Sequence, residues 1–209
     1  MKLISRNKVF ENNNNLAKLI RSFQIDFFDE EDEEDDEMFD ILQFQLDDVK
    51  YEFFIIETHH KDLKTFTEDL SKKLIKLLKF LDIKQITLIS HLKLDFYLGL
   101  ELIENQQILD CYKKLNEVTF SNTYKEAIIC ETNEIEKLID IFFWINQGNQ
   151  GSEFIFWADE SNQFCFYLCK YGKLHFIDFT NGNLISTENL KKLGFSLLKG
   201  KCSDGIMLK

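Results

Sequence analysis

The pattern of apolar and polar residues along the chain predicts helices and strands in alternation. Two long helices are expected, Lys61–Leu81 and Asn133–Asn146, because apolar residues recur every three or four positions in both. In the second helix, Asn133 and Glu136 have the spacing of a capping box. Shorter helices are predicted at Leu16–Phe23 with Asn15 as its cap, at Glu104–Asn116, and at Thr187–Leu193 with Thr187 as its cap.

Strands are predicted where apolar residues alternate with polar ones or form short unbroken runs. The predicted strands are Met38–Leu46, Tyr51–Glu57, Lys84–Ser90, Lys93–Ile103, Glu126–Glu131, Glu153–Ala158, Gln163–Lys170, Lys173–Phe179 and Phe195–Leu198. Short turns containing Gly and Asn separate the three strands between Glu153 and Phe179, which predicts an antiparallel meander. We therefore expect an α+β fold with a mostly antiparallel sheet, two long helices and a C-terminal β-meander.

The length of 209 residues fits one globular unit, residues 1–209. A faint internal repeat qualifies this interpretation. Ile55–Thr58 and Ile128–Thr132 each lead from a strand into a helix that two strands follow. The repeat is consistent with two related lobes, 38–120 and 121–209. The other explanation is coincidence, because Ile is common in strands and Thr is a common helix cap.

The acidic residues are concentrated in one segment. The chain has 25 basic and 36 acidic residues, a formal charge of −11, and nine of the acids form an unbroken run that leaves the rest of the chain at −2. The run consists of Asp29, Glu30, Glu31, Asp32, Glu33, Glu34, Asp35, Asp36 and Glu37. Adjacent like charges cannot pack together, so we expect a flexible, solvated loop. The functional alternative is a binding site for a basic protein, with Phe27, Phe28 and Phe39 as apolar anchors.

Composition excludes several classes of function. Only Arg6 and Arg21 are Arg, and a net-acidic chain with so little Arg is unsuited to direct nucleic-acid recognition. We find no apolar signal segment and no apolar stretch of about 20 residues, so we expect no membrane association and a cytoplasmic location. The five cysteines are scattered without a CxxC pair, which predicts reduced, mostly buried thiols.

Candidate catalytic and metal-binding groups are few. His59 and His60 lie beside Glu57 and Asp62 at a strand end, but adjacent strand residues point to opposite faces. The same rule separates His175 from Asp178, which are three positions apart.

The remaining candidates have structural explanations. His91 fits a turn, and Cys165 and Cys169 share one strand face among aromatic residues, as small core residues do. The acidic run lacks the Gly of an EF-hand loop. We therefore predict no catalytic, cofactor-binding or metal-binding residues, and the nine acidic residues are the candidate partner-binding site.

These observations favour a non-enzymatic, cytoplasmic protein-binding protein. The most concrete hypothesis is a bacterial immunity protein that neutralises a basic toxin such as a nuclease. Two alternatives remain, namely an enzyme with a site near the His59/His60 strand end and a structural or assembly module that uses an open sheet edge in the meander. The sequence leaves self-association open.

Overall fold

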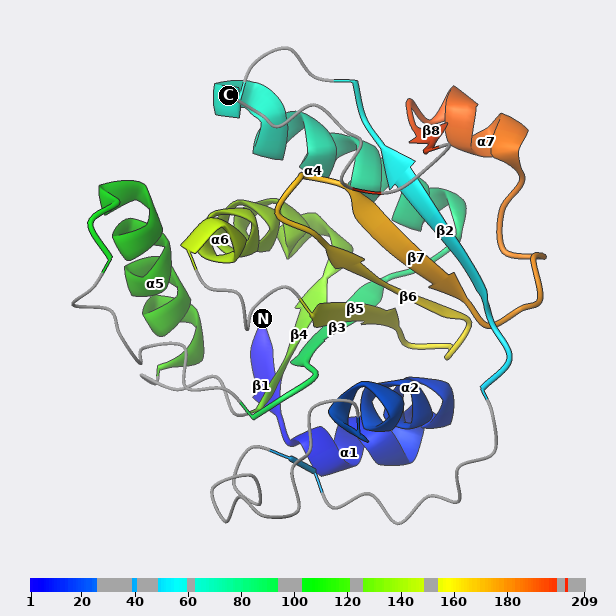
Figure 1. Ribbon diagram of the computed structural model, residues 1–209, viewed down its shortest axis with the longest axis horizontal. Helices are drawn as coiled ribbons and strands as arrows, with labels where there is room; N and C mark the ends of the chain where they lie inside the picture. Colours follow the sequence, from blue (N-terminus) through cyan, green and yellow to red (C-terminus); the bar gives the residue numbers. More distant parts are fainter. Residues whose placement is uncertain are drawn as a thin grey trace.

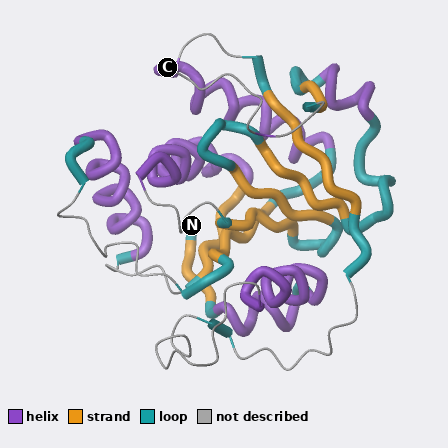
Figure 2. The backbone as a smooth tube through the Cα atoms, viewed as in Figure 1, coloured by secondary structure: helices purple, strands orange, loops and turns teal. Residues whose placement is uncertain are grey.

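A computed structural model describes residues 1–25, 39–40, 49–59, 63–93, 103–120, 126–148, 154–198 and 202. Its centre is one twisted eight-stranded sheet with helices on both faces (Figure 1). In Figure 2 the strands form a single layer between the two groups of helices. The acidic run Asp29–Glu37 lies outside the described residues, as do most of the predicted strands Met38–Leu46 and Lys93–Ile103.

All neighbouring strands of the sheet are antiparallel, in the order β1-β4-β3-β5-β6-β7-β2-β8. The strands are β1 Lys2–Ile4, β2 Glu52–Glu57, β3 Gln85–Ser90, β4 Ala127–Glu131, β5 Ile155–Asp159, β6 Phe164–Leu168, β7 Leu174–Asp178 and β8 Ser196–Leu197. Strands β5, β6 and β7 form the expected meander. The predicted α+β class is therefore confirmed.

The helices divide between the two faces of the sheet. They are α1 Arg6–Asn12, α2 Asn14–Ile25, α4 Leu63–Phe80, α5 Gln106–Thr119, α6 Ile135–Gly148 and α7 Thr187–Lys192, and the short 3₁₀ turn η2, Thr132–Glu134, leads into α6. Helices α1 and α2 cover one face, whereas α4, α5 and α6 cover the other (Figure 1). The prediction of two long helices is loose, because α5 and α6 have the same length, 14 residues each.

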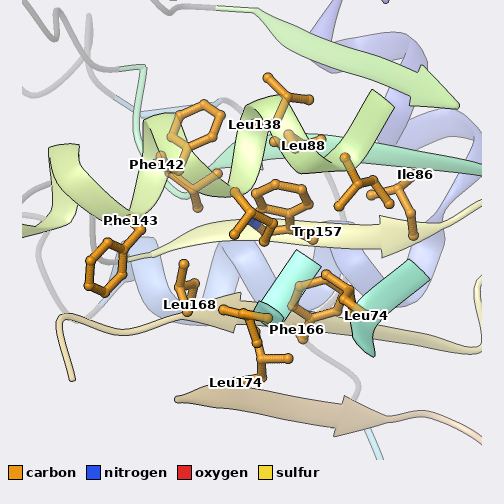
Figure 3. Close-up of a cluster of buried hydrophobic side chains, with 14 of the residues drawn as sticks. Leu74, Ile86, Leu88, Leu138, Phe142, Phe143, Trp157, Phe166, Leu168 and Leu174 are labelled. Atoms are coloured by element: carbon orange, nitrogen blue, oxygen red, sulfur yellow. The ribbon is translucent and has the colours of Figure 1, made fainter. Parts of the chain in front are cut away.

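The meander strands are buried on both sides, as their nearly continuous apolar sequences require. Trp157 points toward α4 and α6, whereas its neighbour Phe156 points toward α1 and α2. In Figure 3, Trp157 lies between Phe142 of α6 and Phe166 of β6, and its ring stacks on Phe166 with the centroids 5.7 Å apart. This double burial fixes the register of each strand, because a shift by one residue would exchange the two faces.

Three predicted helix caps are wrong by one or two residues. Helix α2 is capped by Asn13, whose Oδ1 accepts from the Leu16 amide at 3.0 Å, while Asn15 instead bonds Asn162. Ser186, not Thr187, caps α7. The helical segment beginning at η2 has its capping interaction between the Glu131 amide and Glu134, at 2.9 Å, rather than between Asn133 and Glu136. In each case the chain becomes helical before the predicted cap, which makes that residue part of the helical segment.

The sheet mixes strands from the two candidate lobes. Strand β4, from residues 121–209, lies between β1 and β3, while β2, from residues 38–120, lies between β7 and β8. The division into lobes stays a prediction. The expected open edge in the meander is wrong, because β5 pairs with β3 and β7 pairs with β2, so the edges of the described sheet are β1 and β8.

Candidate functional site

The acidic run is bounded by residues that meet in a buried polar network. Helix α2 ends at Ile25 before the run, and Phe39 and Asp40 follow it. The Gln24 side chain donates to Asp40 Oδ2 at 2.9 Å and to the His91 carbonyl at 2.6 Å. Gln24 and Asp40 thus hold together the two ends of the segment that contains Asp29–Glu37.

Arg6 supplies the positive charge of this network. Its guanidinium Nε donates to Asp40 Oδ1 at 3.0 Å and its Nη2 donates to Asp40 Oδ2 at 2.6 Å, so the pair is bidentate. Both residues are only 4% exposed. Ser5 caps α1 and makes Arg6 the first residue of that helix, with its backbone amide bound to Glu126. The charges of Arg6 and Asp40 therefore balance each other where the ends of this segment meet the folded body.

His91 adds no charge to this network at neutral pH. Burial and the nearby Arg6 guanidinium lower the pKa of its imidazole from 6.5 to about 4. His91 follows β3, as expected of a turn residue, but it is buried, with its ring edge-on to Phe154 and its amide donating to the Phe154 carbonyl.

The structure corrects one of the expected apolar anchors. Phe39 is 6% exposed and belongs to the core, so it cannot contact a partner without leaving its packed position. Phe27 and Phe28 lie outside the described residues, like the run itself.

A second cluster of functional groups joins three residues that the sequence analysis did not combine. Cys169 Sγ lies 3.3 Å from Cys202 Sγ, and His175 Nε2 lies 3.2 Å from Cys202 Sγ. The three potential ligand atoms are all within 4.8 Å of one another. Cys169 and His175 are buried, whereas Cys202 is partly exposed.

The surroundings of this cluster favour uncharged groups. Burial, reinforced by the neighbouring Cys202 thiol, raises the pKa of Cys169, and burial together with the Lys173 ammonium lowers the pKa of His175 to about 4. Lys173 Nζ donates to the Cys202 carbonyl at 3.1 Å and lies 3.6 Å from Glu57 Oε2. Both pKa shifts favour the uncharged forms of Cys169 and His175 near pH 7.

No signal in the linear sequence reveals this cluster. Cys169 and His175 share a face only because of the register between β6 and β7, and Cys202 lies far along the chain. The other cysteines fit the predicted role of buried, reduced thiols, since burial raises the pKa of Cys111, Cys130 and Cys165.

The candidate enzyme site near the end of β2 is not assembled among the described residues. His59 is exposed, with Nε2 3.5 Å from the Ser196 hydroxyl, whereas the Glu57 carboxylate lies beside Lys173. His60 and Asp62 lie outside the described part of the chain. His175 and Asp178 also have separate partners, because Asp178 accepts hydrogen bonds from the Thr180 amide and hydroxyl.

A hollow of about 770 Å³ lies beside helices α4, α5 and α6. Its lining carries both signs of charge, including Glu68, Lys114 and Lys137. Asp140, which also lines it, accepts from the Thr67 hydroxyl at 3.0 Å and pairs with Lys114 at 3.3 Å. Four acidic side chains, Glu68, Glu117, Glu136 and Asp140, stand against Lys114, Lys137 and the amino group of Met1, so the charges are interspersed with only a slight acidic excess.

Comparison of the chain with protein-family models, curated proteins and solved structures gave no match. Within the described ranges, no helix combines the length and apolar character needed to cross a membrane.

Proposed function

We propose that the protein is a non-enzymatic, cytoplasmic binding protein for a basic protein, most concretely a bacterial immunity protein that neutralises a basic toxin such as a nuclease. The observation that carries the proposal is the run of nine acids, Asp29–Glu37, in a chain whose other residues sum to nearly zero charge. The network of Arg6, Gln24 and Asp40 supports it, because it fixes both ends of the segment to the folded body.

Two physical effects would make this segment a recognition element. A dense local charge accelerates encounter with an oppositely charged surface by about 10- to 1,000-fold. Carboxylates that enter the active site of a nuclease take the place of the substrate phosphates, so binding and inhibition come from the same contacts. A charged segment fixed at both ends also loses less conformational freedom on binding than a free tail does.

The test begins with capture of basic proteins from a lysate of the native host, with the full chain as bait, followed by association kinetics with the captured protein. Replacing all nine acids with Asn and Gln should lower the association rate about 10-fold or more and flatten its dependence on salt. The far-ultraviolet circular dichroism should stay unchanged, because the network of Arg6 and Asp40 lies outside the run.

A matched pair of variants separates the run from general acidity. One variant carries Glu31→Gln, Glu33→Gln and Glu34→Gln. The other carries Glu68→Gln, Glu136→Gln and Glu188→Gln, three exposed glutamates on α4, α6 and α7. Only the first should slow association. Equal rates for the two variants, or capture of no basic protein, would show that the run has no role in recognition.

A further inference from the structure

The pairing of β6 with β7 brings Cys169 and His175 to the same face of the sheet. Tyr167 is paired with His175, and the Cys169 amide donates to the Lys173 carbonyl at 3.0 Å, so the ladder continues past the end of β6. Cys169 is therefore the diagonal neighbour of His175, and side chains in this relation are within reach of one another. The His175 ring also stacks on Tyr167, with the centroids 4.5 Å apart, which fixes its orientation.

Cys202 completes the cluster from the C-terminal part of the chain. Its thiol contacts both Cys169 and His175, and its backbone carbonyl is bound by Lys173. Lys173 is 4% exposed and lies next to the Glu57 carboxylate, so its charge is balanced within the protein. Cys202 is thus placed by a hydrogen bond that does not involve its thiol.

The separations suit a four-coordinate thiophilic metal ion. Zinc bonds of about 2.3 Å to sulfur and about 2.0 Å to nitrogen in a tetrahedron put two sulfur ligands about 3.8 Å apart, and a sulfur and a nitrogen about 3.5 Å apart. The observed separations are 3.3 Å between the two sulfur atoms and 3.2 Å between Cys202 Sγ and His175 Nε2. These two separations are a few tenths of an ångström below the tetrahedral values, and the third pair, Cys169 and His175, lies within 4.8 Å, so side-chain shifts of up to about 1 Å would centre an ion.

We propose that Cys169, His175 and Cys202 bind one zinc ion, which fastens the C-terminal part of the chain to the β6–β7 hairpin. Two thiolates and one imidazole are a donor set that selects zinc over magnesium or calcium. Binding releases one proton from each thiol, and a water molecule takes the fourth position. This site is independent of the proposed partner-binding function, because none of its ligands belongs to the acidic run.

The experiment uses the full chain, reduced with a phosphine, freed of metal with a chelator, and then titrated with Co²⁺. We expect the visible bands of tetrahedral Co²⁺ and a thiolate charge-transfer band, both saturating at one metal ion per chain and both removed by added Zn²⁺. Cys169→Ser and Cys202→Ser should each weaken Zn²⁺ binding at least about 100-fold, since loss of a direct ligand exceeds the 10- to 100-fold effect of outer-shell changes.

Cys165→Ala is the matched control, because Cys165 is on the same face of the strand as Cys169 but packs in the core under α1 and α2, away from the cluster. It should keep the Co²⁺ spectrum. Zn²⁺ should also raise the melting temperature of the unmodified chain and of Cys165→Ala, but not that of Cys202→Ser, and circular dichroism identifies variants that fail to fold. The proposal is overturned if the reduced, folded chain binds neither metal, or if both Ser variants keep the spectrum. A Cys169–Cys202 disulfide in a chain that binds no metal when reduced would assign the cluster to redox chemistry instead.

Discussion

Replacement of Asp40 with Ala should destabilise the protein strongly, although Asp40 belongs to no helix or strand. The substitution removes the carboxylate that accepts from Arg6 Nε and Nη2 and from Gln24. Arg6 is 4% exposed, and its Nη1 already lacks a hydrogen-bond partner within the described residues. The substitution therefore leaves an uncompensated charge in the interior.

The expected loss is about 3–5 kcal/mol of unfolding free energy, the usual effect of removing one partner of a buried ion pair. At about 2–4 °C per kcal/mol for a chain of this size, the melting temperature should fall by about 6–20 °C. Urea unfolding followed by circular dichroism measures the free energy directly. Lys192→Ala is the control, since its exposed pair with Glu188 should contribute no more than about 0.5 kcal/mol.

A double variant tests the physical reason for this loss. Arg6→Met together with Asp40→Leu removes both charges and should be less destabilised than Asp40→Ala alone, because no buried charge is left without a partner. The reasoning would be refuted if Asp40→Ala lost less than about 1 kcal/mol. It would also be refuted if the loss of unfolding free energy in the double variant equalled the sum of the losses in Arg6→Met and Asp40→Leu, since the effects of substitutions at coupled residues do not add.

Two further predictions concern stability. Gly172→Ala should cost more than about 1 kcal/mol in urea unfolding, because Gly172 has a φ of +72° and an added Cβ would lie 2.5 Å from Phe66 Cζ; a neutral effect would contradict the close packing of this turn. The pKa of His91 is lowered from 6.5 to about 4 in the folded protein, so the unfolded protein binds a proton at His91 more readily. The free energy of unfolding should therefore fall as the pH drops from 6.5 to about 4, by up to about 3 kcal/mol. His175 has the same lowered pKa and adds to the loss in this window, so His91→Gln should make that part of the pH profile shallower without removing the slope, and an unchanged profile would contradict a contribution from His91.

Local sequence pattern predicts much of this fold. The continuous apolar runs of β5, β6 and β7, with turns at Asn162 and Gly172, determine the meander almost residue by residue. The apolar stripe of α4 is buried as expected at Phe66 and Leu74. These elements depend on hydrophobic periodicity and turn residues, and both are set by residues close together in the sequence.

The elements that sequence reasoning missed depend on distant parts of the chain. Strand β1 and helix α1 lie in a short, polar N-terminal segment, and β1 exists as a strand through its pairing with β4. The interior position of β2, between β7 and β8, is likewise a property of the assembled sheet. Such placements leave no periodic signal.

The candidate sites show the same division. The acidic run is visible in the sequence, whereas the network at its base combines Arg6, Gln24, Asp40 and His91 from separate segments. Cys169 and His175 become neighbours through strand register, and Cys202 joins them from far along the chain. Spacing rules for metal sites apply to ligands within one local motif, so they do not detect this arrangement.

The strand order also has a consequence for how the chain folds during synthesis. Lys2 pairs with Ile129, so at a synthesis rate of about 5–20 residues per second β1 waits roughly 6–25 s for its partner. Strand β2 waits in the same way, because Glu52 pairs with Asp178, which is made 126 residues later. The sheet therefore closes only after β7 has been made, and a nascent chain that stops before β7 leaves β2 without either of its partner strands, β7 and β8.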